Sequence, residues 1–241
     1  MKTRKKRLIW KLLPMLIALL LLGAFFIYTG IYYSADDSAS KALVSDDKVS
    51  ISRISQGLFF DGPGTADALV FYPGGKVEET AYAPLLRQLA EHGVDTFLIS
   101  MPFRLAVFGK NRADGIISAY QYDRWFIGGH SLGGAMAALY AADHPELTGL
   151  ILLAAYPTKP LDKDDLEIVI YGSLDGVLNT DKVIDGRQYS SDHLFEYVIP
   201  GGNHAQFGNY GAQSGDREAV IRPQQQQQLT VEYIIQCLSG N

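Results

Sequence analysis

Short apolar runs that alternate with helix-forming segments constrain the fold of this chain more than any other feature. Uniformly apolar runs joined by helices are typical of a parallel sheet that is covered on both faces. The sequence therefore predicts an α/β fold with a doubly wound, mostly parallel sheet. The expected strands are Ala68–Tyr72, Val94–Ser100, Arg124–Gly128, Gly149–Ala154, Leu166–Tyr171 and Leu194–Ile199, after a leading hairpin of Val49–Ser55 and Leu58–Phe60. The expected helices are Ala81–His92, Asn111–Tyr120, Leu132–Asp143 and Gln224–Leu238.

The first 33 residues have the pattern of a membrane anchor. They hold six basic residues and no acid, and residues 12–33 form a stretch of 22 residues without a charge. A helix of about 20 apolar residues spans the hydrocarbon core of a bilayer. Because the basic cluster comes first, the positive-inside rule places the N-terminus in the cytoplasm and the body outside. We expect a cytoplasmic stub at 1–11, a transmembrane signal anchor at 12–33, a linker at 34–48 and a folded domain at 49–241.

A cleaved signal peptide is the main alternative for the N-terminal segment. The apolar region of a signal peptide usually has 7–15 residues and is followed by a small-x-small cleavage site. The apolar run here is longer, and the candidate site Ser38-Ala39-Ser40 lies far from its core. We therefore favour an uncleaved anchor, with cleavage and a buried core helix as the alternatives.

Composition limits what the body can do. Beyond residue 33 the chain carries 15 basic and 26 acidic residues, and this acidic surface disfavours nucleic acid as a partner. The single cysteine, Cys237, excludes an intramolecular disulfide framework and any CxxC metal or redox site. The glutamine run Gln224–Gln228 opens the last expected helix, where we expect a solvated helix face.

A glycine-flanked serine stands between an expected strand and an expected helix. Residues 129–133 read GHSLG, which matches G-x-S-x-G, after the strand RWFIG and before the helix LGGAMAALYAAD. Such a turn holds a serine in a strained position at the carboxyl end of its strand. The pattern predicts Ser131 as a nucleophile and the Leu132 N–H, at the helix start, as an oxyanion donor. A glycine-rich turn without chemistry is the alternative.

A serine nucleophile needs a histidine base and an acid that orients this base. In sheets of this type the three follow in the order Ser, Asp or Glu, His. Only His193 and His204 lie downstream of a plausible acid, and we favour His204 because it follows the last expected strand. Asp175 directly follows the strand EIVIYG and is the favoured acid, with Asp181 and Asp185 as alternatives.

The loop after the first core strand, Tyr72–Lys76 (YPGGK), is expected to complete the oxyanion hole. A glycine lets the backbone approach a reacting atom closely, so we favour the Gly75 N–H, with the Lys76 N–H or a simple turn as alternatives. The remaining wall of the site is expected from Met101–Asn111 (MPFRLAVFGKN). The expected substrate-binding residues are Lys76, Met101, Phe103 and Arg104. The cations Lys76, Arg104 and Lys110 could receive an anionic substrate group or be ordinary solvated charges.

The segment between the strands GLILLA and EIVIYG is too short to hold a helical cap. Only Tyr156–Leu166, about a dozen residues, remain there. We therefore expect an open site without a lid. An open, shallow site favours a small substrate, or the end of a larger molecule.

Four motifs, YPGGK, GHSLGG, YGSLDG and GGNHAQFG, occur in this order at the ends of expected strands within residues 68–240. They resemble the α/β-hydrolase superfamily, and within it small bacterial members near the dienelactone-hydrolase-like proteins. The chain departs from dienelactone hydrolases because Ser131 stands where those enzymes use cysteine. The resemblance implies an α/β-hydrolase fold and carboxylic-ester hydrolysis through an acyl-enzyme. With no lid segment, it implies short-chain acyl esters, or an acyl group at the end of a larger molecule. It also implies a small-molecule ester as substrate, with no metal and no organic cofactor. A peptidase or acyltransferase with the same triad, or a non-catalytic envelope binding module, is the alternative.

Overall fold

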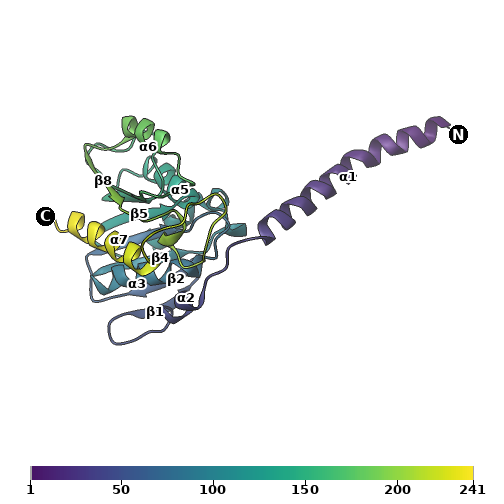
Figure 1. Cartoon of the computed structure of the whole chain (residues 1–241). Helices are drawn as coiled ribbons and strands as arrows, with labels where there is room; N and C mark the ends of the chain where they lie inside the picture. Colours follow the sequence, from purple (N-terminus) through teal and green to yellow (C-terminus); the bar gives the residue numbers. More distant parts are fainter. Residues whose placement is uncertain (1, 241) are drawn as a thin grey trace. The chain divides into compact units, whose positions relative to one another are not determined.

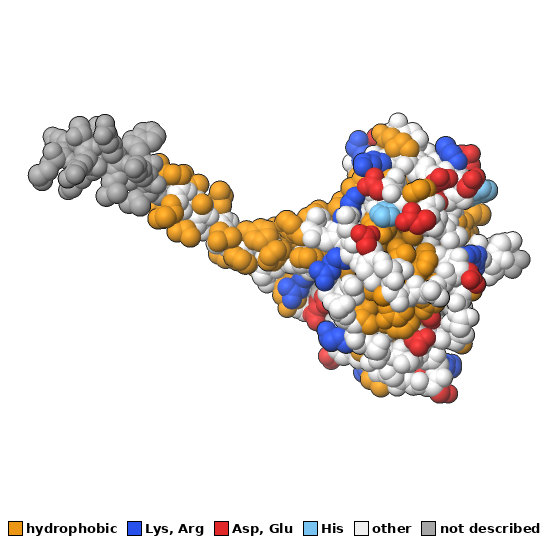
Figure 2. Space-filling model, turned by 180° about the vertical axis from the view of Figure 1, so that it is seen from behind, with side chains coloured by type: hydrophobic (Ala, Val, Ile, Leu, Met, Phe, Trp, Pro, Cys, Tyr) orange, Lys and Arg blue, Asp and Glu red, His pale blue; other side chains and the backbone are white. Residues whose placement is uncertain are grey.

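The computed structural model describes residues 2–240, with side chains from residue 13 on, and divides into two units, 1–32 and 33–241. The first unit is helix α1, Lys2–Gly30. Its segment Leu13–Gly30 is long and apolar enough to cross a membrane, and a signal sequence would have the same length and composition. Apolar side chains cover the described part of α1 (Figure 2).

The second unit, the body, is built around one eight-stranded sheet in the order β1-β2-β4-β3-β5-β6-β7-β8 (Figure 1). The strands are β1 Ser50–Ile54, β2 Gly57–Asp61, β3 Asp67–Tyr72, β4 Val94–Ile99, β5 Arg124–His130, β6 Gly149–Leu153, β7 Leu166–Gly172 and β8 His193–Ile199. The pairs β1–β2 and β2–β4 are antiparallel, and all other pairs are parallel. The predicted leading hairpin and mostly parallel sheet are therefore confirmed.

Helices cover both faces of the sheet. The α-helices of the body are α2 Asp37–Lys41, α3 Ala83–Glu91, α4 Asp114–Ile117, α5 Leu132–Ala141, α6 Thr180–Gly186 and α7 Pro223–Leu238. Short 3-10 helices are η1 Glu79–Tyr82, η2 Pro102–Arg104, η3 Ala106–Phe108, η4 Lys110–Ala113, η5 Arg187–Tyr189 and η6 Ala205–Phe207. The expected helix over Asn111–Tyr120 is thus mostly replaced by η4 and the four-residue α4, and α6 was not expected.

The sheet separates two hydrophobic cores, and β3 shows why its sequence is uniformly apolar. Leu69 and Phe71 pack in the core beneath α3 and α7, whereas Val70 and Tyr72 pack in the core beneath α4, α5 and α6. Successive side chains of a strand point to opposite faces, so a strand buried on both faces needs apolar residues at every position. This double burial holds the carboxyl ends of the parallel strands at one edge of the sheet.

Residues 34–48, the expected linker, pack against the body rather than lying free of it. They contain α2, whose first turn is capped by the Asp36 carboxylate through the backbone N–H groups of Ser38 and Ala39. Ala39 is fully buried, and the Asp36 N–H donates to the Asn209 carbonyl over 2.8 Å. The small residues that make this segment look like a linker also let it pack closely.

Candidate active site

Ser131 occupies a sharp turn between β5 and α5, with φ 52° and ψ −120°. The flanking glycines are required by space, because a Cβ on Gly133 would lie 2.1 Å, and one on Gly129 2.6 Å, from the Tyr72 carbonyl oxygen. The Ser131 N–H donates to the Leu153 carbonyl over 2.9 Å, which fixes the turn to the end of β6. A left-handed non-glycine residue held in this way is strained, and such strain is typical of functional sites. The predicted nucleophile therefore lies in the geometry that its motif requires.

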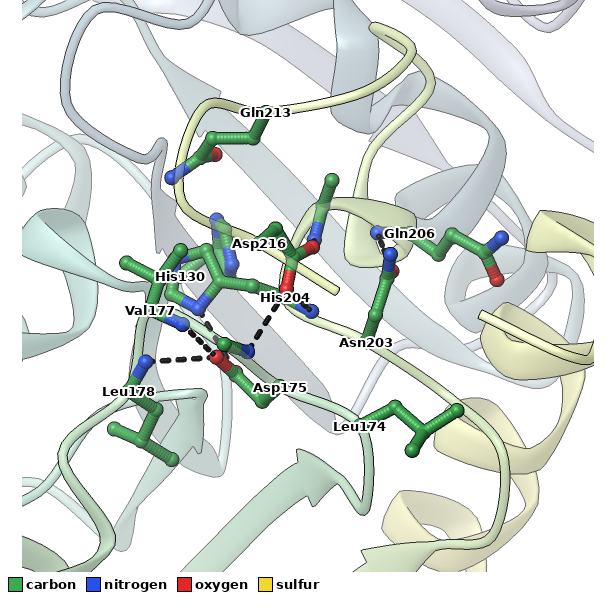
Figure 3. Close-up of polar contacts among 12 residues, drawn as sticks. His130, Leu174, Asp175, Val177, Leu178, Asn203, His204, Gln206, Gln213 and Asp216 are labelled. Carbon is green, nitrogen blue, oxygen red and sulfur yellow. Dashed lines mark hydrogen bonds and ion pairs between the residues drawn. The ribbon is translucent and has the colours of Figure 1, made fainter. Parts of the chain in front are cut away.

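Asp175 and His204 form a buried pair after β7 and β8 (Figure 3). His204 Nδ1 lies 2.8 Å from Asp175 Oδ2, and each side chain is 1% exposed. The other carboxylate oxygen accepts from the N–H groups of Val177 and Leu178 over 2.9 and 2.7 Å. These bonds fix the orientation of the carboxylate. With Nδ1 donating to Asp175, Nε2 is the nitrogen with a lone pair for proton transfer.

One cavity of about 350 Å³ contains both Ser131 and His204. Its other lining residues are Leu132, Ala135, Ala154, Ala155, Tyr156, Thr158, Val177, Leu178 and Asn179. His204 Nε2 is buried and has no hydrogen-bond partner, so the serine–histidine hydrogen bond is not formed in this structure. Catalytic hydrogen bonds often tighten only when substrate binds. The structure thus brings the three predicted residues to the carboxyl edge of the sheet, where Ser131 and His204 line one cavity.

The loops that carry the expected oxyanion donors are in contact. Leu132 is the first residue of α5, and a Cβ on Gly75 would lie 2.8 Å from Leu132 Cδ2, so the two loops are in contact. The Lys76 N–H donates to the Arg104 carbonyl over 2.8 Å and is therefore already used. Of the two candidates in this loop, the geometry favours Gly75.

The expected substrate-binding residues lie outside the cavity that holds Ser131. Met101 is buried in the core beneath α5, and Phe103 is exposed. Lys76, Phe103 and Arg104 all have positive φ angles, between 55° and 59°. The cavity wall comes instead from α5 and from the segments after β6 and β7, the two strands that follow β5 in the order of the sheet. The sequence offered no signal for this choice, since Ala155 and Leu178 are ordinary apolar residues.

The alternative base lies at the opposite edge of the sheet, and the alternative acids are exposed. His193 is exposed at the amino end of β8, and Asp181 and Asp185 are exposed on α6. Asp185 is instead paired with Lys182 over 3.1 Å. Among the side chains that the structure describes, no group of three or more His, Cys, Asp or Glu residues could hold a metal ion.

Asp216 joins the loop that carries Asp175 to the loop that carries His204, a role that the sequence did not predict. Its Oδ1 accepts from the Gly176 N–H over 2.9 Å and from the His204 N–H over 3.3 Å. Its Oδ2 accepts from the Ala205 N–H over 2.9 Å (Figure 3). Gly176 follows the predicted acid, so one carboxylate holds the backbone on both sides of the acid–base pair. No local pattern marks Asp216, which lies in the long segment between β8 and α7.

Arg217 and Gln226 fix the same two loops from other directions. Arg217 Nη2 donates to the Asp175 carbonyl over 2.6 Å. Gln226 is fully buried, accepts from the Asn203 N–H over 2.9 Å and donates to the Asn203 carbonyl over 2.8 Å. The prediction that Gln224–Gln228 form a solvated face is therefore wrong for Gln226 and Gln227, which are buried. The inner side of α7 passes the buried backbone before His204, and this backbone needs hydrogen-bond partners.

His130 lies between the nucleophile turn and the base. Its ring centroid is 4.5 Å from that of His204, and its Nδ1 is 2.7 Å from the Tyr82 hydroxyl. The same hydroxyl accepts from the Gly74 N–H over 3.1 Å, in the loop that carries Gly75. Burial, and secondarily the neighbouring His204, lowers the pKa of His130 well below its ordinary value. His130 is therefore neutral near pH 7, so it packs against His204 without placing a positive charge beside the base.

Comparisons with known proteins agree with this architecture. The model of the alpha/beta hydrolase family matches residues 68–228. Among solved structures, the chain is similar to a CIB-like hydrolase from Thermoplasma acidophilum (14% identity, 78% of this chain and 99% of that chain, TM-score 0.58). It is also similar to a dienelactone hydrolase from Anabaena variabilis (14%, 78% and 98%, 0.55). A third is a monoglyceride lipase from Saccharomyces cerevisiae (12%, 83% and 97%, 0.57). At these identities the likeness shows the fold alone. No curated protein matches the chain.

Proposed function

From the premise that this chain belongs to the alpha/beta hydrolase family, we propose that it is a membrane-anchored serine hydrolase that cleaves carboxylic esters. The observation that carries the proposal is the buried Asp175–His204 pair, whose histidine lines the same cavity as the strained Ser131. A bare glycine-rich turn would not need an oriented histidine beside it. Three residues from three strand ends meet here in the roles that acyl transfer requires.

In the proposed reaction Ser131 Oγ attacks the acyl carbon while His204 Nε2 takes the hydroxyl proton. The oxyanion that forms is stabilised by the N–H groups of Leu132 and Gly75, whose positions at a helix start and beside it suit developing negative charge. As the C–O bond to the leaving alcohol breaks, His204 gives its proton to the departing oxygen. Water, activated by the same nitrogen, then hydrolyses the acyl-enzyme.

The cavity supports a small acyl group. Three alanines, Ala135, Ala154 and Ala155, line it with Leu132 and Leu178, which makes its wall apolar and short. The segment between β6 and β7 contains no helix, so nothing of the size of a cap covers the site from there. We propose short-chain esters, or an acyl group at the end of a larger molecule, as the substrate class.

The proposed location is the membrane, with residues 1–11 in the cytoplasm, an anchor from residue 12 and the body outside. The apolar segment Leu13–Gly30 and the preceding basic cluster support this orientation. Protease added to intact spheroplasts is expected to remove the body and spare a short N-terminal stub. A body that resists digestion until lysis would reverse the orientation, and a soluble mature form beginning near Lys41 would indicate cleavage.

Labelling with a fluorophosphonate probe tests the proposed chemistry. The wild-type protein should be labelled and should hydrolyse p-nitrophenyl acetate, and Ser131→Ala should do neither. Ser118→Ala changes an exposed serine elsewhere and is the matched control, which should behave like the wild type. Labelling that persists in Ser131→Ala would exclude the assigned nucleophile. A panel of p-nitrophenyl esters and lactones, with and without an added alcohol acceptor, then separates hydrolysis from acyl transfer.

A further inference from the structure

The first residue of the body is bound to the loop that carries the proposed oxyanion donor. The Tyr33 N–H donates to the Lys76 carbonyl over 2.8 Å, and the Glu78 N–H donates to the Tyr33 carbonyl over 2.9 Å. These two bonds form a parallel bridge directly after Gly75. The Tyr33 hydroxyl accepts from the Ser214 N–H over 3.0 Å, in the segment that follows the base. Tyr33 is therefore fixed at the carboxyl edge of the sheet, where the site lies.

The residues after Tyr33 continue along the same edge. The Asp36 N–H donates to the Asn209 carbonyl over 2.8 Å, and Asn209 Nδ2 donates to Ser38 Oγ over 2.7 Å. Asn209 lies five residues after His204 and is itself held by Gln227 Nε2 over 2.7 Å. The segment from Tyr33 to Ser38 thus joins the oxyanion side of the site to its base side.

Few residues of chain separate Tyr33 from the end of the apolar helix. Gly30 ends α1, and only Ile31 and Tyr32 separate it from Tyr33. Three residues of fully extended chain span at most about 11 Å. If α1 spans a membrane, the chain therefore leaves the lipid within a few residues of Tyr33.

The same edge carries an exposed apolar loop. Val107 and Phe108 are 49% and 54% exposed, and they belong to the segment that the Lys76 N–H holds through the Arg104 carbonyl. Residues 101–113 contain three basic residues and no acid, and Lys110 of this set pairs with Asp143 over 2.7 Å. Exposed apolar side chains among basic ones are typical of surfaces that bind a lipid interface.

We propose that the carboxyl edge, with Val107 and Phe108, lies against the lipid surface, and that the substrate is an amphiphilic ester resident in that lipid layer. The proposal rests on the proposed function and names the source of its substrate. It accounts for a cavity with no cap, because a lipid surface against this edge would shield the site as a lid does in a soluble enzyme. It also accounts for a docked segment at 33–38, which a freely moving tether would not need.

Nitroxide labels test the surface independently of catalysis. In the full chain with Cys237→Ser, reconstituted in phosphatidylcholine–phosphatidylglycerol vesicles, one label is placed at Val107→Cys. The control label is placed at Phe195→Cys, an exposed position near the amino end of β8 and so away from the carboxyl edge. We expect the Val107 label to be relaxed more by oxygen than by an aqueous nickel complex, and the Phe195 label to show the reverse. Equal access of the nickel complex to both labels would overturn the proposal.

Kinetics on two substrates test the substrate class. In the same vesicles, Val107→Ser/Phe108→Ser should lower hydrolysis of hexadecyl acetate, a short-chain ester of an alcohol held in the lipid, by about tenfold, because two apolar side chains that would enter the lipid are lost. Hydrolysis of water-soluble p-nitrophenyl acetate should change by less than about twofold. Phe195→Ser should leave both rates unchanged.

The two substrates also separate the possible failures. Equal loss on both substrates, or no loss on either, would contradict the lipid-surface proposal and leave the ester hydrolase intact. A wild-type protein that hydrolyses neither substrate would instead contradict the proposed function, whatever the labels report.

Discussion

The two halves of the site are held by different kinds of contact. On the nucleophile side, backbone packs directly on backbone, because Gly129 and Gly133 lie against the Tyr72 carbonyl with no room for a side chain. On the acid–base side, side chains from distant segments hold the loops, above all Asp216 and Gln226. Local sterics can be read from a five-residue motif, whereas long-range polar contacts depend on how the whole chain packs. A single substitution in the nucleophile half should therefore abolish activity, whereas single substitutions among the contacts of the acid–base half should lower activity only in part.

The largest effect is expected from the base itself. His204→Ala should lower kcat/KM for p-nitrophenyl acetate by about a thousandfold or more, because no other group can take the proton from the nucleophile. His193→Ala removes an exposed histidine from the other end of the sheet and should leave the rate near normal. The opposite pattern would mean that the acid–base half has been assigned to the wrong loop.

In the nucleophile half, the addition of one methyl group should be enough to disrupt the turn that holds Ser131. Gly133→Ala places a Cβ 2.1 Å from the Tyr72 carbonyl and 2.3 Å from the Pro73 carbonyl, and backbone cannot yield as a side chain can. We expect loss of fluorophosphonate labelling and a fall of about 3 kcal/mol in the free energy of unfolding, measured by denaturant titration in detergent. Gly23→Ala, at a glycine with open space around it, should change neither quantity. A labelled and stable Gly133→Ala protein would refute the steric account of this turn.

The acid–base half should weaken through Asp216. Asp216→Asn replaces one acceptor by a donor that faces backbone N–H groups, which loosens the loops of both Asp175 and His204. We expect the rate of fluorophosphonate labelling to fall by about tenfold, and the free energy of unfolding by about 2 kcal/mol. The exposed Asp181→Asn is the matched control. If labelling keeps its rate while stability falls, Asp216 supports the fold without positioning the base.

A smaller effect is expected within the glutamine run. Gln226→Ala leaves the N–H and carbonyl of Asn203 unpaired in a buried position and should lower the free energy of unfolding by about 2 kcal/mol with a lesser loss of rate. Its exposed neighbour Gln225→Ala should change stability by less than about 0.5 kcal/mol. Equal effects at the two positions would show that the buried pairing with Asn203 is unimportant.

The smallest effect concerns the histidine between the two halves. Because the folded-state pKa of His130 is depressed, the unfolded chain binds this proton more readily, so stability is lost as pH falls below about 6.5. Between pH 7 and pH 5.5 the stability of the wild type relative to His130→Asn should fall by about 1 kcal/mol. Comparing the two proteins at each pH cancels the other titrating groups. A constant difference across this range would mean that His130 titrates alike in both states.

The same contrast explains what the sequence could predict. The buried strands, Ser131 and the Asp175–His204 pair follow from local patterns and from the order of strand ends, and the structure places them as those patterns require. Asp216 and Gln226 carry no local signal, since one stands in a long loop and the other in a polar run. The packing of the segment after Tyr33 against the body could not be predicted either, because small polar residues are equally common in free linkers and in closely packed segments.

The residues that line the cavity could not be predicted from the sequence either. Met101–Asn111 has the apolar character expected of a wall, yet Ala154, Ala155 and Leu178 supply it. Which loop faces a cavity depends on the twist of the sheet and on which strands are neighbours. Those are properties of the assembled fold and not of any one segment.

A structure of the protein after reaction with a short-chain phosphonate ester tests the central claim most directly. The account predicts phosphorus bonded to Ser131 Oγ, with the phosphoryl oxygen about 2.7–3.1 Å from the N–H nitrogens of Leu132 and Gly75. It also predicts His204 Nε2 turned toward the leaving-group side while Nδ1 keeps its bond to Asp175. An adduct on another residue, or a phosphoryl oxygen that faces away from both N–H groups, would contradict the account.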